Sequence, residues 1–255
     1  MSTQYLAGLD LGTTGAKAML FDLRGNPVGA AYRDYPCQYV RPNWVEQDAD
    51  LVVDSAMQVM RAAISQAGVR RDEIAAVSVS AQRCCGIFLD SADRQLRPML
   101  SWQDNRAAAE VEEIASAIPP AAYYARTGFP NGTTWLLAKL LWVRRHEPRV
   151  WGQLRRIVQM HDYFLHALGV EPYYVDYNDA CFFGFFDSAA CAWDADLLRL
   201  FDLDPALLPV PAASGTRAGV VSAAGAARSG LAAGTPIAIG AGDQCAGALG
   251  AGVNA

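Results

Sequence analysis

The sequence predicts an α/β domain built around a mixed sheet, and three observations carry that prediction. Three short apolar segments joined by tight turns open the chain, which is typical of an antiparallel meander. Apolar strands then alternate with amphipathic helices. The composition, 52% hydrophobic and 18% charged over 255 residues, is that of a folded chain with a sizeable core. Because no repeat and no low-complexity linker divides the chain, we expect one domain over residues 1–255.

The meander is predicted from its turns. Residues 24–27 (RGNP) have strong turn chemistry, and residues 12–15 (GTTG) form an earlier turn. The expected strands are therefore 4–11, 16–22 and 28–33.

The first long helix is predicted to start after an Asp48 N-cap and to stop at Gly68. Its apolar residues recur at helical spacing, at Val52, Ala56, Val59, Met60, Ala63, Ile64 and Ala67. Further strands are expected at 74–80, 86–90, near 98–101, 157–159 and 236–241. Further helices are expected at 106–117, at 134–146 before Pro148, from 159 to Gly169, and from Asp243 onward. The small residues of 212–234 are interpreted as surface connections.

Charge and composition exclude several classes of protein. With 21 basic and 26 acidic side chains the net charge is -5, and no basic cluster offers a footprint for nucleic acid. No apolar run approaches the ~18–20 residues of a membrane span, and the first residues do not resemble a signal peptide. The six cysteines show no C-x-x-C spacing, and there are only three histidines. We therefore expect a cytoplasmic protein without a zinc site, acting on a small polar molecule.

A carboxylate and a hydroxyl-rich turn stand together near the N-terminus. The turn Gly12-Thr13-Thr14-Gly15 follows Asp10 at a strand end. Its backbone N–H groups and hydroxyls can contact phosphate oxygens, while Asp10 can hold Mg²⁺. The alternative is an ordinary hairpin turn.

A second carboxylate follows a glycine-rich strand end. Asp243 comes after Gly240-Ala241-Gly242 and opens a helix, where the helix N-terminus stabilises a negative charge. An aspartate in that position can accept a proton from a substrate hydroxyl. The alternative is a plain N-cap.

Polar side chains also follow two further strands, where open α/β sheets place ligand-binding residues. These are Gln82 and Arg83 after strand 74–80, with Trp102 and Asp104 after the strand near 98–101. Together they offer hydrogen bonds and one stacking face for a polyol. Core packing of Trp102 and helix capping by Asp104 are the alternatives. The aromatic segments at 173–174 and 182–186 are interpreted as core and interface residues, and a thiol nucleophile at Cys84 or Cys85 is disfavoured.

In order along the chain, these motifs resemble the FGGY family of carbohydrate kinases, which includes glycerol-kinase-like and xylulokinase-like branches. The segments that carry the resemblance are GLDLGTT (8–14), NWVEQD (43–48), WQDNR (102–106), KLLW (139–142), YNDA (177–180), WD (193–194) and GDQ (242–244). Asn43 stands where the family usually has Gly.

The resemblance implies an actin-like, ribonuclease-H-type fold and ATP-dependent phosphorylation of a hydroxyl on a small carbohydrate. It implies that Asp243 is the general base and that Asp10 lies near Mg²⁺. Substrate contacts would come from Gln82, Arg83, Trp102, Asp104 and Gln244. The transferring phosphates would lie along Gly12, Thr13, Thr14 and Lys17.

The resemblance leaves the substrate open between a ketose and a polyol. Cys84 stands where the glycerol branch has Glu, and the Met-His pair of the xylulokinase branch is missing. The resemblance implies a protein about twice as long, with the adenosine pocket in a C-terminal lobe for which we expect no counterpart in residues 1–255. We expect a truncated sequence whose isolated chain turns over negligibly, and a homodimer stays open. Two rivals are a non-catalytic carbohydrate-binding or regulatory lobe, and an actin- or Hsp70-like ATPase.

Overall fold

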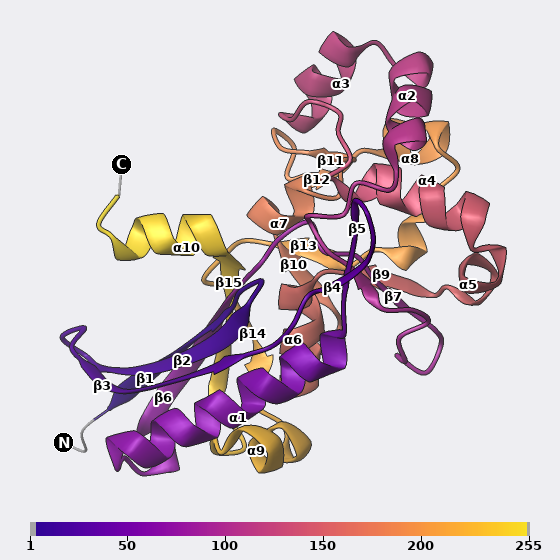
Figure 1. The fold of residues 1–255 in the computed structure, drawn as a ribbon. Coiled ribbons are helices and arrows are strands. Elements are labelled where there is room, and N and C mark those ends of the chain that lie inside the picture. Colours follow the sequence, from indigo (N-terminus) through magenta and orange to yellow (C-terminus); the bar gives the residue numbers. More distant parts are fainter. Residues whose placement is uncertain (1–3, 254–255) are drawn as a thin grey trace.

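The computed structural model describes residues 4–253, and Figure 1 shows their arrangement. Ala255, on which the expected truncation rests, lies outside these residues. A mixed sheet of six strands forms one part of the molecule, and helices with short strand pairs form the other. Within the described part of the chain, no helix is long and apolar enough to cross a bilayer.

The central sheet confirms the predicted meander and the mixed strand directions. Its strands, in spatial order, are β14 (Arg217–Val220), β15 (Pro236–Gly242), β6 (Ile74–Ala81), β1 (Tyr5–Leu11), β2 (Gly15–Asp22) and β3 (Pro27–Asp34). β1, β2 and β3 pair antiparallel, whereas β1, β6 and β15 run parallel to one another. The carboxyl ends of these three parallel strands therefore meet at one edge of the sheet.

Three helices lie on one side of this sheet: the first two contact its strands and bury its apolar side chains, and the third packs against both of these helices. They are α1 (Ala49–Ala67), α6 (Met160–Leu168) and α9 (Ala223–Ser229). α1 begins as predicted, because the Asp48 side chain accepts hydrogen bonds from the N–H groups of Asp50 and Leu51. It ends at Gly68, whose φ of 64° is costly for other residues. The helix α10 (Asp243–Gly250) contacts β15 and β6 and lies on the side away from α1 (Figure 1).

A second hydrophobic cluster lies beside the sheet and is built mainly from helices. The helices outside the sheet layers are α2 (Ala108–Ala117), α3 (Pro120–Thr127), α4 (Leu136–His146), α5 (Pro148–Gln153), α7 (Tyr177–Cys181) and α8 (Ala195–Leu200). The short strands are β4 (Gln38–Arg41), β5 (Trp44–Gln47) and β8 (Met99–Leu100) in one sheet, and the pairs β7 (Ile87–Leu89) with β9 (Arg156–Val158), β10 (Tyr174–Asp176) with β13 (Val210–Ala212), and β11 (Phe186–Asp187) with β12 (Ala192–Trp193). Two 3₁₀ turns lie at Arg71–Glu73 and Pro205–Leu207.

One prediction about the fold is wrong. The stretch 212–234 was expected to be surface connection, but it contributes the edge strand β14 and the helix α9. Its small residues permit close packing: a Cβ on Gly225 would lie 2.4 Å from the carbonyl oxygen of Leu168. Val221 and Leu231 are buried in the core on either side of α9. Glycine here allows one helix to approach the end of another, and does not mark a loop.

Candidate active site at the edge of the sheet

A cavity of about 490 Å³ lies at the edge where the parallel strands end. The sheet supplies Thr13 after β1, Arg83 after β6 and Asp243 after β15. The helical part supplies the opposite wall. The full lining is Thr13, Arg83, Cys84, Trp102, Phe129, Thr134, Trp135, Asn178, Phe182, Asp243 and Gln244. Two parts of the molecule with separate hydrophobic clusters thus meet at one cavity, which has both polar and aromatic lining residues.

Asp243 is paired with Arg83 at this edge. The Arg83 Nε lies 3.2 Å from Asp243 Oδ1, and the Asp243 side chain is 41% exposed. The Arg83 guanidinium also lies 4.3 Å from the ring centroid of Phe182. An exposed carboxylate at the first position of α10, fixed by one cation, can accept a proton from a bound hydroxyl.

Glycines at the end of β15 make this approach possible. A Cβ on Gly242 would lie 2.2 Å from Arg83 Cδ and 2.7 Å from Asn178 Oδ1. A Cβ on Gly240 would lie 1.6 Å from the carbonyl oxygen of Val79 in β6. The segment GAGD therefore needs glycine at both positions to bring Asp243 to the cavity.

The turn between β1 and β2 is held in place from several sides. Gly12 donates its N–H to the carbonyl of Gly15, and Tyr35 donates its hydroxyl to the carbonyl of Gly12 at 2.6 Å. The Trp102 indole Nε1 donates to Thr13 Oγ1 at 2.9 Å. Trp102 is 41% exposed, so the alternative of core packing is wrong, and it is the cavity wall next to this turn.

Asp10 and Lys17 face each other in the register of β1 and β2, close behind the turn. Ser80 donates its hydroxyl to Asp10 Oδ1 at 3.0 Å. Burial raises the pKa of Asp10, and the nearby charge of Asp243 adds to this effect. Two carboxylates at one edge, with the charge of Asp243 raising the pKa of Asp10, suit a divalent cation, since Mg²⁺ prefers carboxylate and water ligands.

The structure places Asp104 and Gln82 away from the cavity. Asp104 was predicted to contact substrate, but it is fully buried and its carboxylate accepts hydrogen bonds from Arg106 and from the N–H of Val45. Gln82 is 1% exposed and donates its amide to Gln47 Oε1 at 3.0 Å. Gln47 in turn donates to the Thr13 carbonyl at 2.8 Å. The Gln82 side chain is thus linked to the turn at residues 12–15, called here the phosphate-type turn, only through the side chain of Gln47.

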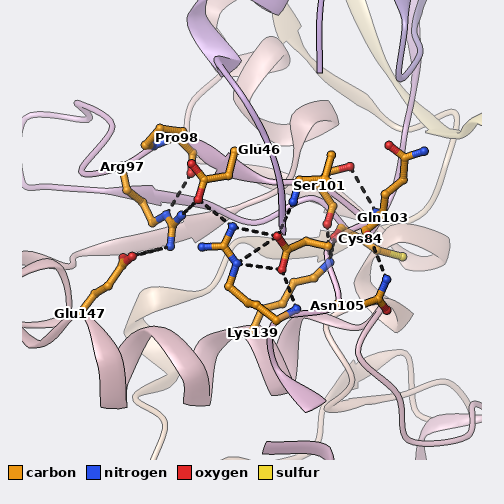
Figure 2. Close-up of polar contacts among 12 residues, drawn as sticks. Glu46, Cys84, Arg97, Pro98, Ser101, Gln103, Asn105, Lys139 and Glu147 are labelled. Carbon is orange, nitrogen blue, oxygen red and sulfur yellow. Dashed lines mark hydrogen bonds and ion pairs between the residues drawn. The ribbon is translucent and has the colours of Figure 1, made fainter. Parts of the chain in front are cut away.

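Asp104 belongs to a largely buried polar network, and Figure 2 labels Glu46, Arg97 and Glu147 of that network. Arg106 pairs with both Asp104 and Glu46, and Arg97 pairs with Glu46 and Glu147. In the same view, Lys139 donates from Nζ to backbone carbonyls on segments next to the cavity. The acids and guanidinium groups of this network neutralise one another while buried, and losing one partner costs stability.

Several cavity residues escaped prediction from the sequence. Phe129, Trp135 and Phe182 form an aromatic wall with ring centroids 5.1 to 5.5 Å apart. Residues 182–186 were expected to be core and interface; all five are buried, and Phe182 also lines the cavity. Asn178 lies in the YNDA segment, whose resemblance to the family was a usable signal. For Thr134 and Trp135 no motif in the sequence offered one.

A buried group of side chains lies behind the cavity wall. Ligand atoms of His161, Asp176 and Asp179 lie within 4.8 Å of one another. His161 Nε2 accepts the Gly240 N–H at 3.2 Å, and Asp176 caps α7, so these two are already occupied. Asp179 has no hydrogen-bond partner on either side-chain oxygen among the described residues. Its burial, together with the charges of Asp176 and Asp162, raises its pKa well above the ordinary range.

Comparisons with known proteins agree with this geometry. The N-terminal domain of the FGGY family of carbohydrate kinases matches residues 5–250. The chain is 32% identical over 211 residues to a glycerol kinase of Aromatoleum aromaticum, covering 80% of this chain and 42% of that protein. It is 29% identical over 246 residues to the xylulose kinase of Escherichia coli, covering 96% of this chain and 50% of that protein.

A solved structure gives the same result for the fold. The xylulose kinase of Rhodospirillum rubrum superposes with a TM-score of 0.94 at 32% identity, covering 99% of this chain and 51% of that one. The chain spans about half the length of the relatives it matches or slightly less. The actin-like fold expected from the resemblance is that of these kinases and is confirmed. By sequence and by structure, this chain belongs to the FGGY family of carbohydrate kinases, matching its N-terminal domain.

Proposed function

We propose that this chain is the sugar-binding and phosphate-binding lobe of an ATP-dependent kinase that phosphorylates a hydroxyl of a ketose or polyol. The observation that carries the proposal is the cavity that joins Asp243, Arg83 and the Thr13 turn. A proton acceptor and a phosphate-type turn at one edge are the two groups that hydroxyl phosphorylation needs within reach of each other.

Each residue has a definite task in this proposal. Asp243 accepts the proton of the attacking hydroxyl, while Arg83 fixes the carboxylate. Gln244 and Asn178 offer amide groups to the remaining hydroxyls, and Trp102 supplies a stacking face. Gly12, Thr13, Thr14 and Lys17 lie along the phosphates. Catalysis then consists mainly of positioning and charge stabilisation.

Asp10 is the residue that would hold Mg²⁺, directly or through water. Its raised pKa and its nearness to Asp243 fit a cation at this edge. When bound with ATP, the ion supplies neutralisation of the phosphate charge. The hydrogen bond from Ser80 to Oδ1 restrains the Asp10 side chain.

The same proposal includes a second lobe and a cytoplasmic location. A second lobe provides the adenosine pocket, closes the cavity against water and makes turnover efficient. All six cysteines are free thiols, which suits the reducing cytoplasm. A homodimer remains a prediction.

Ligand binding by this chain gives the first test. We expect D-xylulose, glycerol or a related ketose or polyol to raise the melting temperature in a thermal-shift series with and without Mg-ATP. A ligand at 100 times its dissociation constant adds about 2.7 kcal/mol to the free energy of unfolding. Stabilisation by Mg-ATP that ignores every sugar would instead favour the ATPase alternative.

The Asp243→Asn variant separates a kinase from a binding lobe. In the protein with both lobes, turnover should fall by about 10²–10⁴-fold, the usual contribution of a general base. Sugar affinity should change far less, because Asn keeps a hydrogen-bonding oxygen. Equal turnover by the variant and the parent protein would exclude Asp243 as the base.

A further inference from the structure

Cys84 has a backbone conformation that its residue type disfavours. Its φ is 61°, in the left-handed region, where a residue with a Cβ is strained by about 1–3 kcal/mol. Cys84 follows Arg83, the residue that pairs with Asp243. Such a conformation persists only where the surroundings hold it, so the groups that hold Cys84 also determine where Arg83 lies.

The N–H side of Cys84 is held by a buried amide. Cys84 donates its N–H to Gln159 Oε1 at 2.7 Å, and Gln159 Nε2 donates to the carbonyl of Asp179 at 2.6 Å. Gln159 is fully buried. One side chain therefore ties the Arg83–Cys84 loop to α7, the helix that carries Asn178 of the cavity wall.

The carbonyl side of Cys84 is held by a buried ammonium. Lys139 Nζ donates to the carbonyl of Cys84 at 3.0 Å, to that of Ser101 at 2.7 Å and to that of Thr134 at 3.0 Å. All three of its donors are used, and Lys139 is fully buried on α4 (Figure 2). Burial lowers the pKa of Lys139 to about 8, while the three carbonyl acceptors around Nζ match the three donors of the charged form.

The three carbonyls belong to three separate segments of the cavity wall. Cys84 and Thr134 line the cavity themselves, and Ser101 directly precedes Trp102. A buried lysine is commonly paired with a carboxylate. Lys139 has no carboxylate partner among the described residues, and its three hydrogen bonds all go to backbone carbonyls. Its three bonds fix the loops relative to one another.

We propose that Lys139 and Gln159 are positioning residues that clamp the strained Cys84 peptide from both sides and thereby hold Arg83 beside Asp243. The importance of this clamp for catalysis, through Arg83 and Asp243, rests on the proposed kinase function. The clamp itself is a property of the fold that can be measured without any sugar.

Hydrogen exchange of the 82–86 segment tests the clamp directly. Lys139→Met and Gln159→Met each keep an apolar chain of similar length and remove the polar contacts. Lys139→Met should speed exchange in this segment by at least about tenfold, the smallest factor expected for lost hydrogen bonds of a charged group, and Gln159→Met by at least about fivefold, the smallest factor expected when a neutral buried group is left unpaired. Exchange in β2 should stay unchanged.

Arg144→Met is the matched control on the same helix. Arg144 donates to the backbone carbonyls of Phe201 and Asp202 at 2.7 and 3.3 Å, away from the cavity. Its loss should leave the 82–86 segment protected. Uniformly faster exchange over the whole chain in Lys139→Met, or no change in the segment, would refute the clamp.

A second comparison isolates the strain at Cys84. In the Lys139→Met background, Cys84→Gly should recover more protection and more affinity for D-xylulose or glycerol than Cys84→Ala, because only glycine accepts this φ without strain. Equal behaviour of the two variants would overturn the proposal. If the parent chain binds neither sugar, the proposed function fails, while the exchange data still decide the clamp. Should Lys139→Met not fold, Gln159→Met provides the same comparison.

Discussion

The indole Nε1 of Trp102 donates a hydrogen bond of 2.9 Å to Thr13 Oγ1. The two residues are far apart in the sequence and belong to different parts of the molecule, one to the turn after β1 and the other to the segment after β8. This bond joins the phosphate-type turn to the wall of the cavity. The position of the turn therefore depends on the position of the cavity wall, and the reverse also holds.

A double-mutant cycle measures that dependence. Trp102→Phe removes the donor and Thr13→Val removes the acceptor, while both keep most of the side-chain volume. We expect a coupling of about 0.5–1.5 kcal/mol in the free energy of unfolding, measured in urea, because that is the usual net worth of one hydrogen bond. Strict additivity of the two variants would show that the bond does not form in solution.

Local signals allowed much of the sheet and the long helix to be predicted. The turn residues of 24–27 and the Asp48 and Gly68 caps act within a few residues, so each is visible in the sequence. The helix α9 was missed because its glycine serves a contact with Leu168, a residue distant in sequence. Such a contact leaves no periodic pattern.

The site was predictable to the extent that residues follow strand ends. Thr13, Arg83 and Asp243 meet at the cavity because β1, β6 and β15 are parallel neighbours. Asp104 follows a strand as well, yet its carboxylate is consumed by Arg106. Sequence position indicates which edge a side chain reaches, but not which partner it finds there.

Gly240 should tolerate no side chain. A Cβ there would lie 1.6 Å from the Val79 carbonyl oxygen in the neighbouring strand, and backbone of this kind cannot move aside. Gly240→Ala should lower the free energy of unfolding by at least about 2 kcal/mol, within the range for overpacking. The measurement is denaturant unfolding of the purified chain.

Gly247→Ala is the matched control for that substitution. Gly247 lies in α10, and a Cβ added to it would have nothing within 4 Å. Alanine there should be neutral or stabilising by up to about 1 kcal/mol, because it favours the helix. A Gly240→Ala variant as stable as Gly247→Ala would contradict the close approach of β15 and β6.

Asp179→Asn should stabilise the fold at neutral pH. Burial and neighbouring acids raise the pKa of Asp179 well above its usual value of 3.8. At pH values between the unfolded and the folded pKa, the folded state keeps this proton and the unfolded chain has lost it. The free energy of unfolding therefore falls as pH rises above about 4. Asparagine does not titrate and escapes that loss.

The difference between variant and parent should accordingly grow with pH. It should be small near pH 4 and increase toward pH 7 by at most about 1.4 kcal/mol per pH unit, the limit for one proton. Urea unfolding across this range measures it, with Glu112→Gln on the exposed surface of α2 as control. A variant less stable than the parent at pH 7 would mean that Asp179 is held as a charge, with Arg83 as the cation that favours its ionised form.

Asp104→Asn decides between the substrate contact expected from sequence and the buried ion pair found in the structure. Asp104 and Arg106 side chains are 0% and 1% exposed, and removing one partner of a buried pair costs about 3–5 kcal/mol. The variant should lose that stability in denaturant unfolding, while its folded fraction binds sugar normally. Asp243→Asn should behave in the opposite way, with little change in stability, since its side chain is 41% exposed. If Asp104→Asn kept its stability but lost sugar binding, Asp104 would be a substrate contact after all, and the network around Glu46 would hold without it.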